Sequence, residues 1–102
     1  MFAVIHSCKA EKDIRVFTNI PDYHGGNLIV QLENTCRHCE AYNVSVSLEM
    51  LVQEKGVQVG KTVTVNIIES IHAGQKLAFT YHADSILIGL IGDKTAEFIN
   101  CI

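Results

Sequence analysis

The residues with the clearest chemical potential are two cysteines three positions apart, Cys36 and Cys39, in the polar stretch from Asn34 to Glu40. Thiols at this spacing can point to one side of a tight turn, where they hold a metal ion or form a redox disulfide. A structural zinc ion needs four ligands, and the sequence has no second tight pair of cysteines. A redox pair normally opens a helix in a βαβ unit, which this stretch does not predict. We therefore expect plain loop thiols, with a local disulfide or a metal site built from Cys36, Cys39 and His38 as the alternatives.

Further ligands for such a site would have to come from distant parts of the chain. The candidates are the other two cysteines, Cys8 and Cys101, together with His6 and His24. Cys8 and Cys101 fall in the first and last predicted strands, so a disulfide between them is geometrically conceivable. Four cysteines in 102 residues are too few for a disulfide scaffold, and free cysteines are often small buried hydrophobes. Free thiols are the prediction.

No catalytic constellation stands out in the sequence. Nucleophilic catalysis needs a base beside the nucleophile and a third group that orients the base. A set such as Cys36, His82 and Asp84 can be written down, but chance supplies such sets in any chain of this size. The acidic residues also lack the spacing of a metal-binding loop. We expect no enzymatic activity, no catalytic or cofactor-binding residues, and no cofactor.

The bulk composition is that of one folded domain spanning residues 1–102. The chain is 48% hydrophobic and 19% charged, with a net charge of -3. This balance argues against a nucleic-acid-binding protein, which normally carries a basic patch. No apolar run approaches the roughly 18 residues needed to cross a bilayer, and the N-terminal residues lack a basic region typical of a signal peptide. We expect no membrane partner and a cytoplasmic location.

A period of two dominates the stretch from Asn27 to Leu51, in two runs separated by the cysteine-containing link. Such alternation predicts strands with one buried and one solvated face. The apolar residues expected on the buried faces are Leu28, Val30 and Leu32 in the first run and Val44, Val46, Leu48 and Met50 in the second. The two strands either pair as a long hairpin or face each other across a core.

The rest of the chain shows more short strand-like runs and no sustained helical period. Turn signals separate these runs at intervals of roughly 8–12 residues, which is typical of an all-β sandwich or barrel. We place turns or loops at 10–13, 19–26, 70–75, 83–85 and 92–94, and we interpret 53–61 as a turn with a short edge segment. Further strands are predicted at 2–7, 14–18, 62–69, 76–82, 86–91 and 95–102.

The order of these features resembles the immunoglobulin-like β-sandwich domains that follow the catalytic core of transglutaminases. The resemblance rests on the run Gly26 to Asn34, the long strand Tyr42 to Val52 with its turn at Lys55-Gly56, the strand Thr62 to Ile71, and the aromatic strand end Phe79-Thr80-Tyr81 before Ile86 to Ile91. It implies an immunoglobulin-like sandwich of about seven to eight antiparallel strands. The sequence has no Trp and no Gly-Gln-Cys-Trp motif, so it would carry none of that family's catalytic or calcium-binding residues.

The sequence therefore predicts a non-catalytic accessory or interaction domain, whose partner is a neighbouring domain, another protein or a second copy of the chain. Ile29 and Ile68 are apolar residues on nominally outer faces and could belong to a contact surface. The alternative function is a small thiol protein that binds zinc or switches redox state through Cys36 and Cys39.

Overall fold

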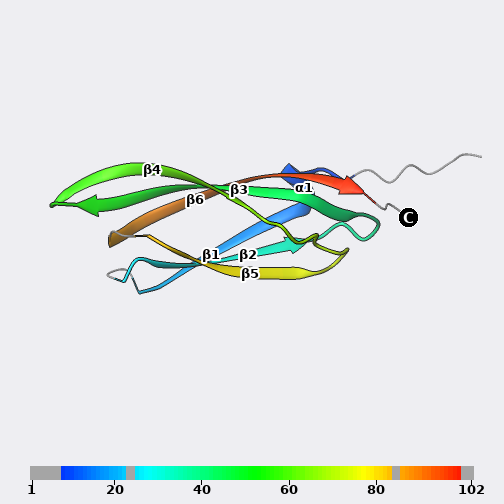
Figure 1. The fold of residues 1–102 in the computed structure, drawn as a ribbon, viewed down its shortest axis with the longest axis horizontal. Coiled ribbons are helices and arrows are strands. Elements are labelled where there is room, and N and C mark those ends of the chain that lie inside the picture. Colours follow the sequence, from blue (N-terminus) through cyan, green and yellow to red (C-terminus); the bar gives the residue numbers. More distant parts are fainter. Residues whose placement is uncertain (1–7, 23–24, 84–85, 100–102) are drawn as a thin grey trace, which may run out of the picture.

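The structure is a computed structural model that describes residues 8–22, 25–83 and 86–99. It is built almost entirely from β-strands, which confirms the all-β class (Figure 1). The elements are α1 (Ala10–Asp13), β1 (Ile14–Asp22), β2 (Asn27–Asn34), β3 (Glu40–Glu54), β4 (Val57–Asn66), β5 (Lys76–His82) and β6 (Ile86–Ile99). Among these residues no helix has the length and apolar character that crossing a membrane requires.

The strands form two antiparallel sheets of three strands each, in the orders β1-β2-β5 and β4-β3-β6. The two strands at the centre of the sequence pattern, β2 and β3, are the middle strands of different sheets. They therefore face each other across the core, and the hairpin alternative is wrong. On one side of the molecule β1 contacts β6, and α1 contacts both strands. On the other side lie the sheet edges β4 and β5.

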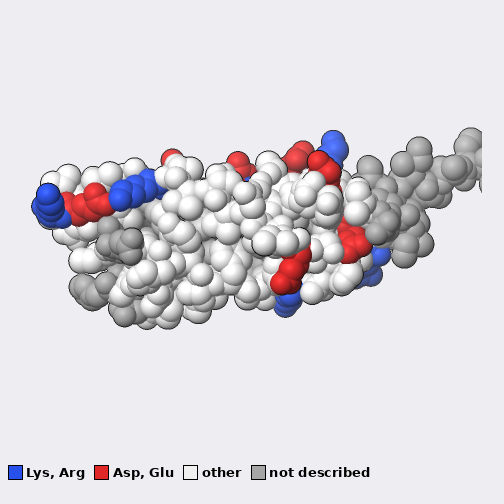
Figure 2. Space-filling view, in the orientation of Figure 1, with Lys and Arg blue, Asp and Glu red and all other residues white. Residues whose placement is uncertain are grey.

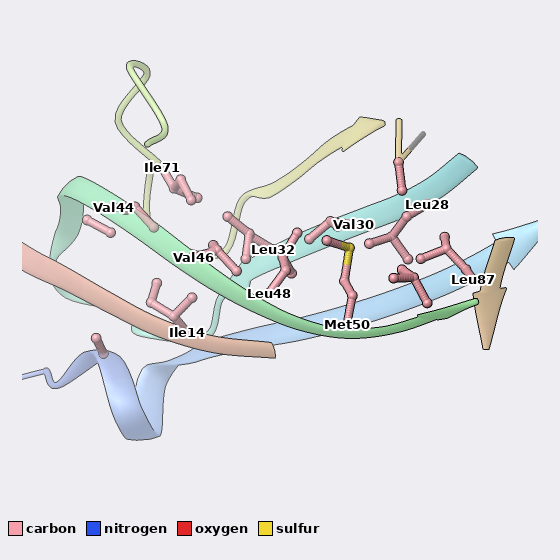
Figure 3. Packing of buried hydrophobic residues seen from close by; sticks show 14 residues of the cluster. Ile14, Leu28, Val30, Leu32, Val44, Val46, Leu48, Met50, Ile71 and Leu87 are labelled. Atoms are coloured by element: carbon pink, nitrogen blue, oxygen red, sulfur yellow. The ribbon is translucent and has the colours of Figure 1, made fainter. Parts of the chain in front are cut away.

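The buried side chains of β2 and β3 form the centre of the hydrophobic core, as the alternating pattern predicts. Leu28, Val30 and Leu32 of β2 are fully buried. They point toward the buried residues of β3 (Figure 3), which are Val44, Val46, Leu48 and Met50. Burying an aliphatic side chain of this size stabilises a fold by about 1.5–3 kcal/mol. These seven residues therefore hold the two sheets together.

The turns or loops predicted at 92–94, 53–61 and 19–26 are absent or shorter in the structure, because long strand pairing overrides local turn signals. Residues 92–94 lie inside β6, since β3 extends far enough to pair with this segment, Leu48 opposite Gly92 and Ser47 opposite Asp93. The register of this pairing shifts between Tyr42 and Ser45 and between Leu51 and Val52, where the ladder is locally irregular. Within 53–61 the turn is confined to Lys55-Gly56, and the short edge segment is the start of the longer edge strand β4. β1 extends as far as Asp22, so residues 19–22 are strand and not loop.

Six strands are assigned within the described residues. The two strands predicted at 86–91 and 95–102 are parts of the single strand β6 as far as Ile99. The turn predicted at 10–13 is the short helix α1. The strand predicted at 2–7 and the last three residues of the chain lie outside the described residues.

Candidate functional site

Three cysteine sulfurs converge at the end of the molecule where β2 leads into β3. The Sγ atoms of Cys8, Cys36 and Cys39 all lie within 4.8 Å of one another. Cys36 and Cys39 are buried, whereas Cys8, which precedes α1, is half-buried. We refer to these three residues as the cysteine cluster. Cys101 lies outside the described residues.

The cluster is oxidised in the structure. Cys8 and Cys36 form a disulfide, Cys39 is also disulfide-bonded, and no described cysteine is a free thiol. The prediction of free thiols is therefore wrong for these residues. The error has a physical reason: the contact between Cys8 and Cys36 joins positions 28 residues apart, which no local spacing reveals.

The backbone of the loop that carries Cys36 and Cys39 wraps around one sulfur. The Sγ atom of Cys36 accepts hydrogen bonds from the backbone N–H of His38 at 3.4 Å and of Cys39 at 3.2 Å. Donors aimed at a sulfur favour its negatively charged thiolate form over the neutral thiol. The loop therefore provides a local environment suited to a thiolate at Cys36.

Asn34 holds this loop in place from the end of β2. Its side chain is completely buried, and its Oδ1 accepts the backbone N–H of Cys36 at 3.0 Å. Its Nδ2 donates to the carbonyl oxygens of Cys39 and Ile71, each at 3.0 Å. An asparagine that bonds the N–H two residues ahead forms a local turn. That turn brings Cys36 over the end of the strand.

Sequence reasoning missed the role of Asn34, although a signal was present. An asparagine two residues before the first cysteine of the Cys36-x-x-Cys39 pair is the pattern of such a turn. Asn34 also uses its backbone: its N–H donates to the carbonyl of Gln75, and its carbonyl accepts from the N–H of Gly74. One residue thus connects the cysteine loop with the segment between β4 and β5.

The segment before β1 brings Cys8 to the same place. The end of α1 is tied to the cysteine loop because the carbonyl of Asp13 accepts from both the N–H (2.8 Å) and the Oγ1 (3.0 Å) of Thr35. The Asp13 carboxylate in turn accepts the N–H of Lys9 at 2.8 Å. These bonds fix the direction in which the chain leaves α1 toward Cys8.

Of the other residues singled out in the sequence, those that the structure describes do not join the cluster. His38 is exposed, and the group of potential metal ligands contains Cys8 in its place. His82 contacts Asn27 at the start of β2, whereas Cys36 follows the end of that strand, so Cys36 and His82 lie far apart. His6, His24 and Asp84 lie outside the described residues.

A small polar network near the cluster also escaped sequence reasoning. The Glu40 carboxylate accepts a hydrogen bond from the Ser70 hydroxyl at 2.6 Å and lies 3.0 Å from Nδ1 of His72. The Ser70 hydroxyl is thus bonded to the carboxylate of Glu40, and His72 contacts this carboxylate and not the hydroxyl. Both bonds flank the bridge between Ala41 and Ile71, which this network braces.

A groove of about 300 Å³ lies between the sheet edges β4 and β5. Its apolar lining consists of Val65, Ile67 and Ile68 on one side and Leu77 and Phe79 on the other. Ile68 is 96% exposed, the highest value among the large hydrophobic residues described. On the face drawn in Figure 2, charged side chains gather at the tip of the β3–β4 hairpin and around the opposite end, with a broad uncharged area between them.

Comparison of the chain with protein-family models, with curated proteins and with solved structures finds no match in any of the three. The resemblance to the domains that follow the transglutaminase core therefore stays a prediction.

Proposed function

We propose that this chain is a non-catalytic, immunoglobulin-like β-sandwich domain that binds an extended apolar segment of a partner protein along the groove between β4 and β5. The observation that carries the proposal is the apolar lining of this groove at two adjacent sheet edges. The partner segment belongs either to a neighbouring domain or to a separate protein.

The backbone at both edges is suited to adding a strand. Within the described residues, β4 is hydrogen-bonded only to β3 and β5 only to β2. The outer edge of each strand therefore presents backbone N–H and C=O groups, which are a template for an extended peptide. Peptide recognition by strand addition draws affinity from these main-chain bonds and specificity from pockets for alternate side chains.

The side chains along the two edges supply the apolar half of the interaction. Along β5 and the second half of β4, every second residue is half-buried and packs against the rim of the core: Val63, Val65 and Ile67 from β4 and its extension, and Leu77, Phe79 and Tyr81 from β5. A strand seated between them would remove more of this surface from water. Each 100 Å² of apolar surface so buried contributes about 2.5 kcal/mol before the cost of ordering the peptide.

The chemistry of the groove supports binding over catalysis. Glu69 is the one ionisable residue in its lining, and no cysteine or serine lines it. An acid without a nucleophile or a second titratable group beside it gives no route to acid–base or covalent catalysis. An apolar groove at a sheet edge is instead a typical site for an extended ligand.

The test is a selection of random peptides displayed on phage against the immobilised chain, followed by fluorescence titration of the enriched sequences as labelled peptides. We expect enriched peptides with alternating apolar residues and no proline in the paired stretch, since proline lacks the backbone donor. Ile68→Asp and Ala78→Lys change exposed residues of the groove and should each weaken binding by about tenfold or more.

Val57→Asp is the matched control, because Val57 is 61% exposed at the hairpin tip, outside the groove lining. It should leave peptide affinity unchanged. The proposal is wrong if no peptide is enriched, or if the groove variants bind enriched peptides as well as the parent chain does. Self-association that disappears in Ile68→Asp would instead identify the occupant as a second copy.

A further inference from the structure

The cysteine cluster has a second possible state besides the disulfide seen here. Three sulfurs within 4.8 Å of one another are close to the spacing in a tetrahedral zinc–thiolate centre, where Zn–S bonds of about 2.3 Å separate the sulfurs by about 3.8 Å. Small side-chain rotations after reduction would bring all three to this spacing. The same residues can therefore serve as disulfide partners or as metal ligands.

The surroundings of the cluster match those of a structural metal site. The N–H groups of His38 and Cys39 point at the Cys36 sulfur, and hydrogen bonds to ligand atoms orient them and stabilise their charge. Asn34 fixes the backbone at both ends of the loop through Cys36 and Cys39. Two of the three sulfurs are buried, so a bound ion would be shielded from solvent.

We propose that the reduced chain binds one Zn²⁺ ion through Cys8, Cys36 and Cys39, and that the disulfide form is the oxidised alternative of the same site. This inference goes beyond the proposed peptide binding and does not depend on it. The pairing Cys36-x-x-Cys39 supplies two adjacent ligands, as the sequence alternative expected, but Cys8 takes the place of His38.

A dithiol can serve as the reductant that converts the disulfide form of the chain into the zinc-binding form. Each disulfide takes up two electrons and two protons, its S–S bond breaks to give two thiols, and the dithiol becomes a disulfide itself. Zn²⁺ then displaces the protons of the ligand thiols, which pass to the buffer. A compartment that keeps thiols reduced favours the zinc form, and an oxidising one favours the disulfide form.

Access to the cluster is open on one side. Cys8 borders a surface hollow of about 310 Å³ that is also lined by Lys9, Lys94 and Thr95. A small reductant or a hydrated metal ion can approach Cys8 through this hollow without unfolding of the sheets. The hollow is on the side of the molecule closed by α1 and β6, away from the groove between β4 and β5.

The first experiment compares metal binding by the reduced and the oxidised full chain. Protein reduced under anaerobic conditions and freed of reductant is titrated with Zn²⁺ in competition with a chromogenic chelator, and separately with Co²⁺. The reduced chain should bind one ion, and its cobalt form should show sulfur-to-metal charge transfer and the intense visible bands of tetrahedral coordination. The oxidised chain should bind none. Substoichiometric binding, an octahedral cobalt spectrum, or equal binding by the oxidised chain would overturn the proposal.

The second experiment assigns the ligands. Cys8→Ser, Cys36→Ser and Cys39→Ser should each lower zinc affinity by about 100-fold or more, since each removes a thiolate ligand. Unchanged affinity in any of these three variants would reject that residue as a ligand. His38→Ala is the control and should bind as the parent chain does.

A third measurement uses the parent chain, so its result does not depend on whether the cysteine variants fold. In the parent chain, bound zinc should protect Cys8, Cys36 and Cys39 from alkylation, and removal of zinc by a chelator should expose all three. Alkylation of any of Cys8, Cys36 or Cys39 at the same rate with and without zinc would contradict its role. Peptide binding at the β4–β5 groove is measured separately, so failure of either proposal is recognised without reference to the other.

Discussion

The strand β3 begins at Glu40 beside a cross-linked, hydrogen-bonded loop and ends at Glu54 in a two-residue turn exposed to solvent. At the first end, a disulfide and the buried Asn34 join β2, β3 and the segments that precede β1 and β5. At the second end, the β3–β4 hairpin carries an exposed ion pair between Lys61 and Glu54. The two ends share a strand but differ in what stabilises them.

The two ends of β3 therefore show two different ways of stabilising the end of a pair of sheets. The cysteine end is stabilised by contacts between residues far apart in sequence, and few other residue types could make any one of these contacts. The hairpin tip relies on neighbouring residues, since Lys55 and Gly56 both adopt positive φ angles, 51° and 77°, as a tight two-residue hairpin turn requires. An exposed ion pair such as that of Lys61 and Glu54 adds little, at most about 1 kcal/mol. Changes at the cysteine end should therefore have larger and wider effects.

The largest effect is expected from removal of the Cys8–Cys36 disulfide in the absence of zinc. The bond closes a loop with a sequence separation of 28 residues, for which chain entropy predicts a stabilisation of about 3–4 kcal/mol. Cys8→Ser should lower the free energy of unfolding by about this amount, measured by urea denaturation under non-reducing conditions. Lys12→Ser, at an exposed position in the same segment, should change it by less than about 0.5 kcal/mol. Equal stability of Cys8→Ser and the parent chain would show that the cross-link does not set the stability of this end.

The next largest effect is expected at Asn34. Replacing it with alanine leaves the N–H of Cys36 and the carbonyls of Cys39 and Ile71 without their buried partner. Unsatisfied buried groups cost about 1–3 kcal/mol each and are not additive, so Asn34→Ala should destabilise the fold by about 2–3 kcal/mol in the same denaturation assay.

Asn34→Asp separates the contribution of the donor from that of the acceptor. The aspartate keeps the acceptor for Cys36 but places an oxygen against two carbonyl oxygens, so it should be at least as destabilising as alanine at neutral pH. Asn19→Ala, at an exposed position of β1, is the control and should be nearly neutral. A small effect at Asn34 would mean that the cysteine loop holds its shape without the asparagine.

The sequence predicted the core well because the alternation in β2 and β3 is a local property of each strand. Leu32 and Val46, for example, are buried as the period of two requires. The assignment of these strands to opposite sheets was not predictable, because the loop between them fits either a hairpin or a crossing between layers. β6 was divided wrongly because Gly92 and Asp93 are strong turn formers in isolation. Pairing with the long β3 decided their conformation.

The cysteine cluster was only half predictable for a similar reason. The spacing of Cys36 and Cys39 pointed to the correct loop, and the turn at Asn34 had a local signal that was overlooked. The position of Cys8 beside the cysteine loop depends on the hydrogen bonds from Thr35 to the carbonyl of Asp13. These two residues are 22 positions apart in the sequence. No spacing rule identifies a contact of this kind from one sequence.

The smallest effect is expected at the hairpin tip, where Gly56 and Gly60 form a matched pair. A Cβ atom at either position would meet nothing within 4 Å, but only Gly56 has a positive φ, +77°. Gly56→Ala should therefore destabilise the chain by about 1 kcal/mol through backbone conformation alone. Gly60→Ala should be neutral or stabilising by up to about 1 kcal/mol, because alanine restricts the unfolded chain at a compatible site.

The same pair tests whether the two ends are independent. Sites that share no partners have additive effects on stability, so the cost of Gly56→Ala in urea denaturation should be the same in the parent chain and in Cys8→Ser. A cost that changes between the two backgrounds would mean that strain at the tip is transmitted along β3 to the cysteine loop. In that case the oxidation state of the cysteine cluster would also affect β4, which pairs with β3. Peptide binding at the groove between β4 and β5 would then depend on that oxidation state.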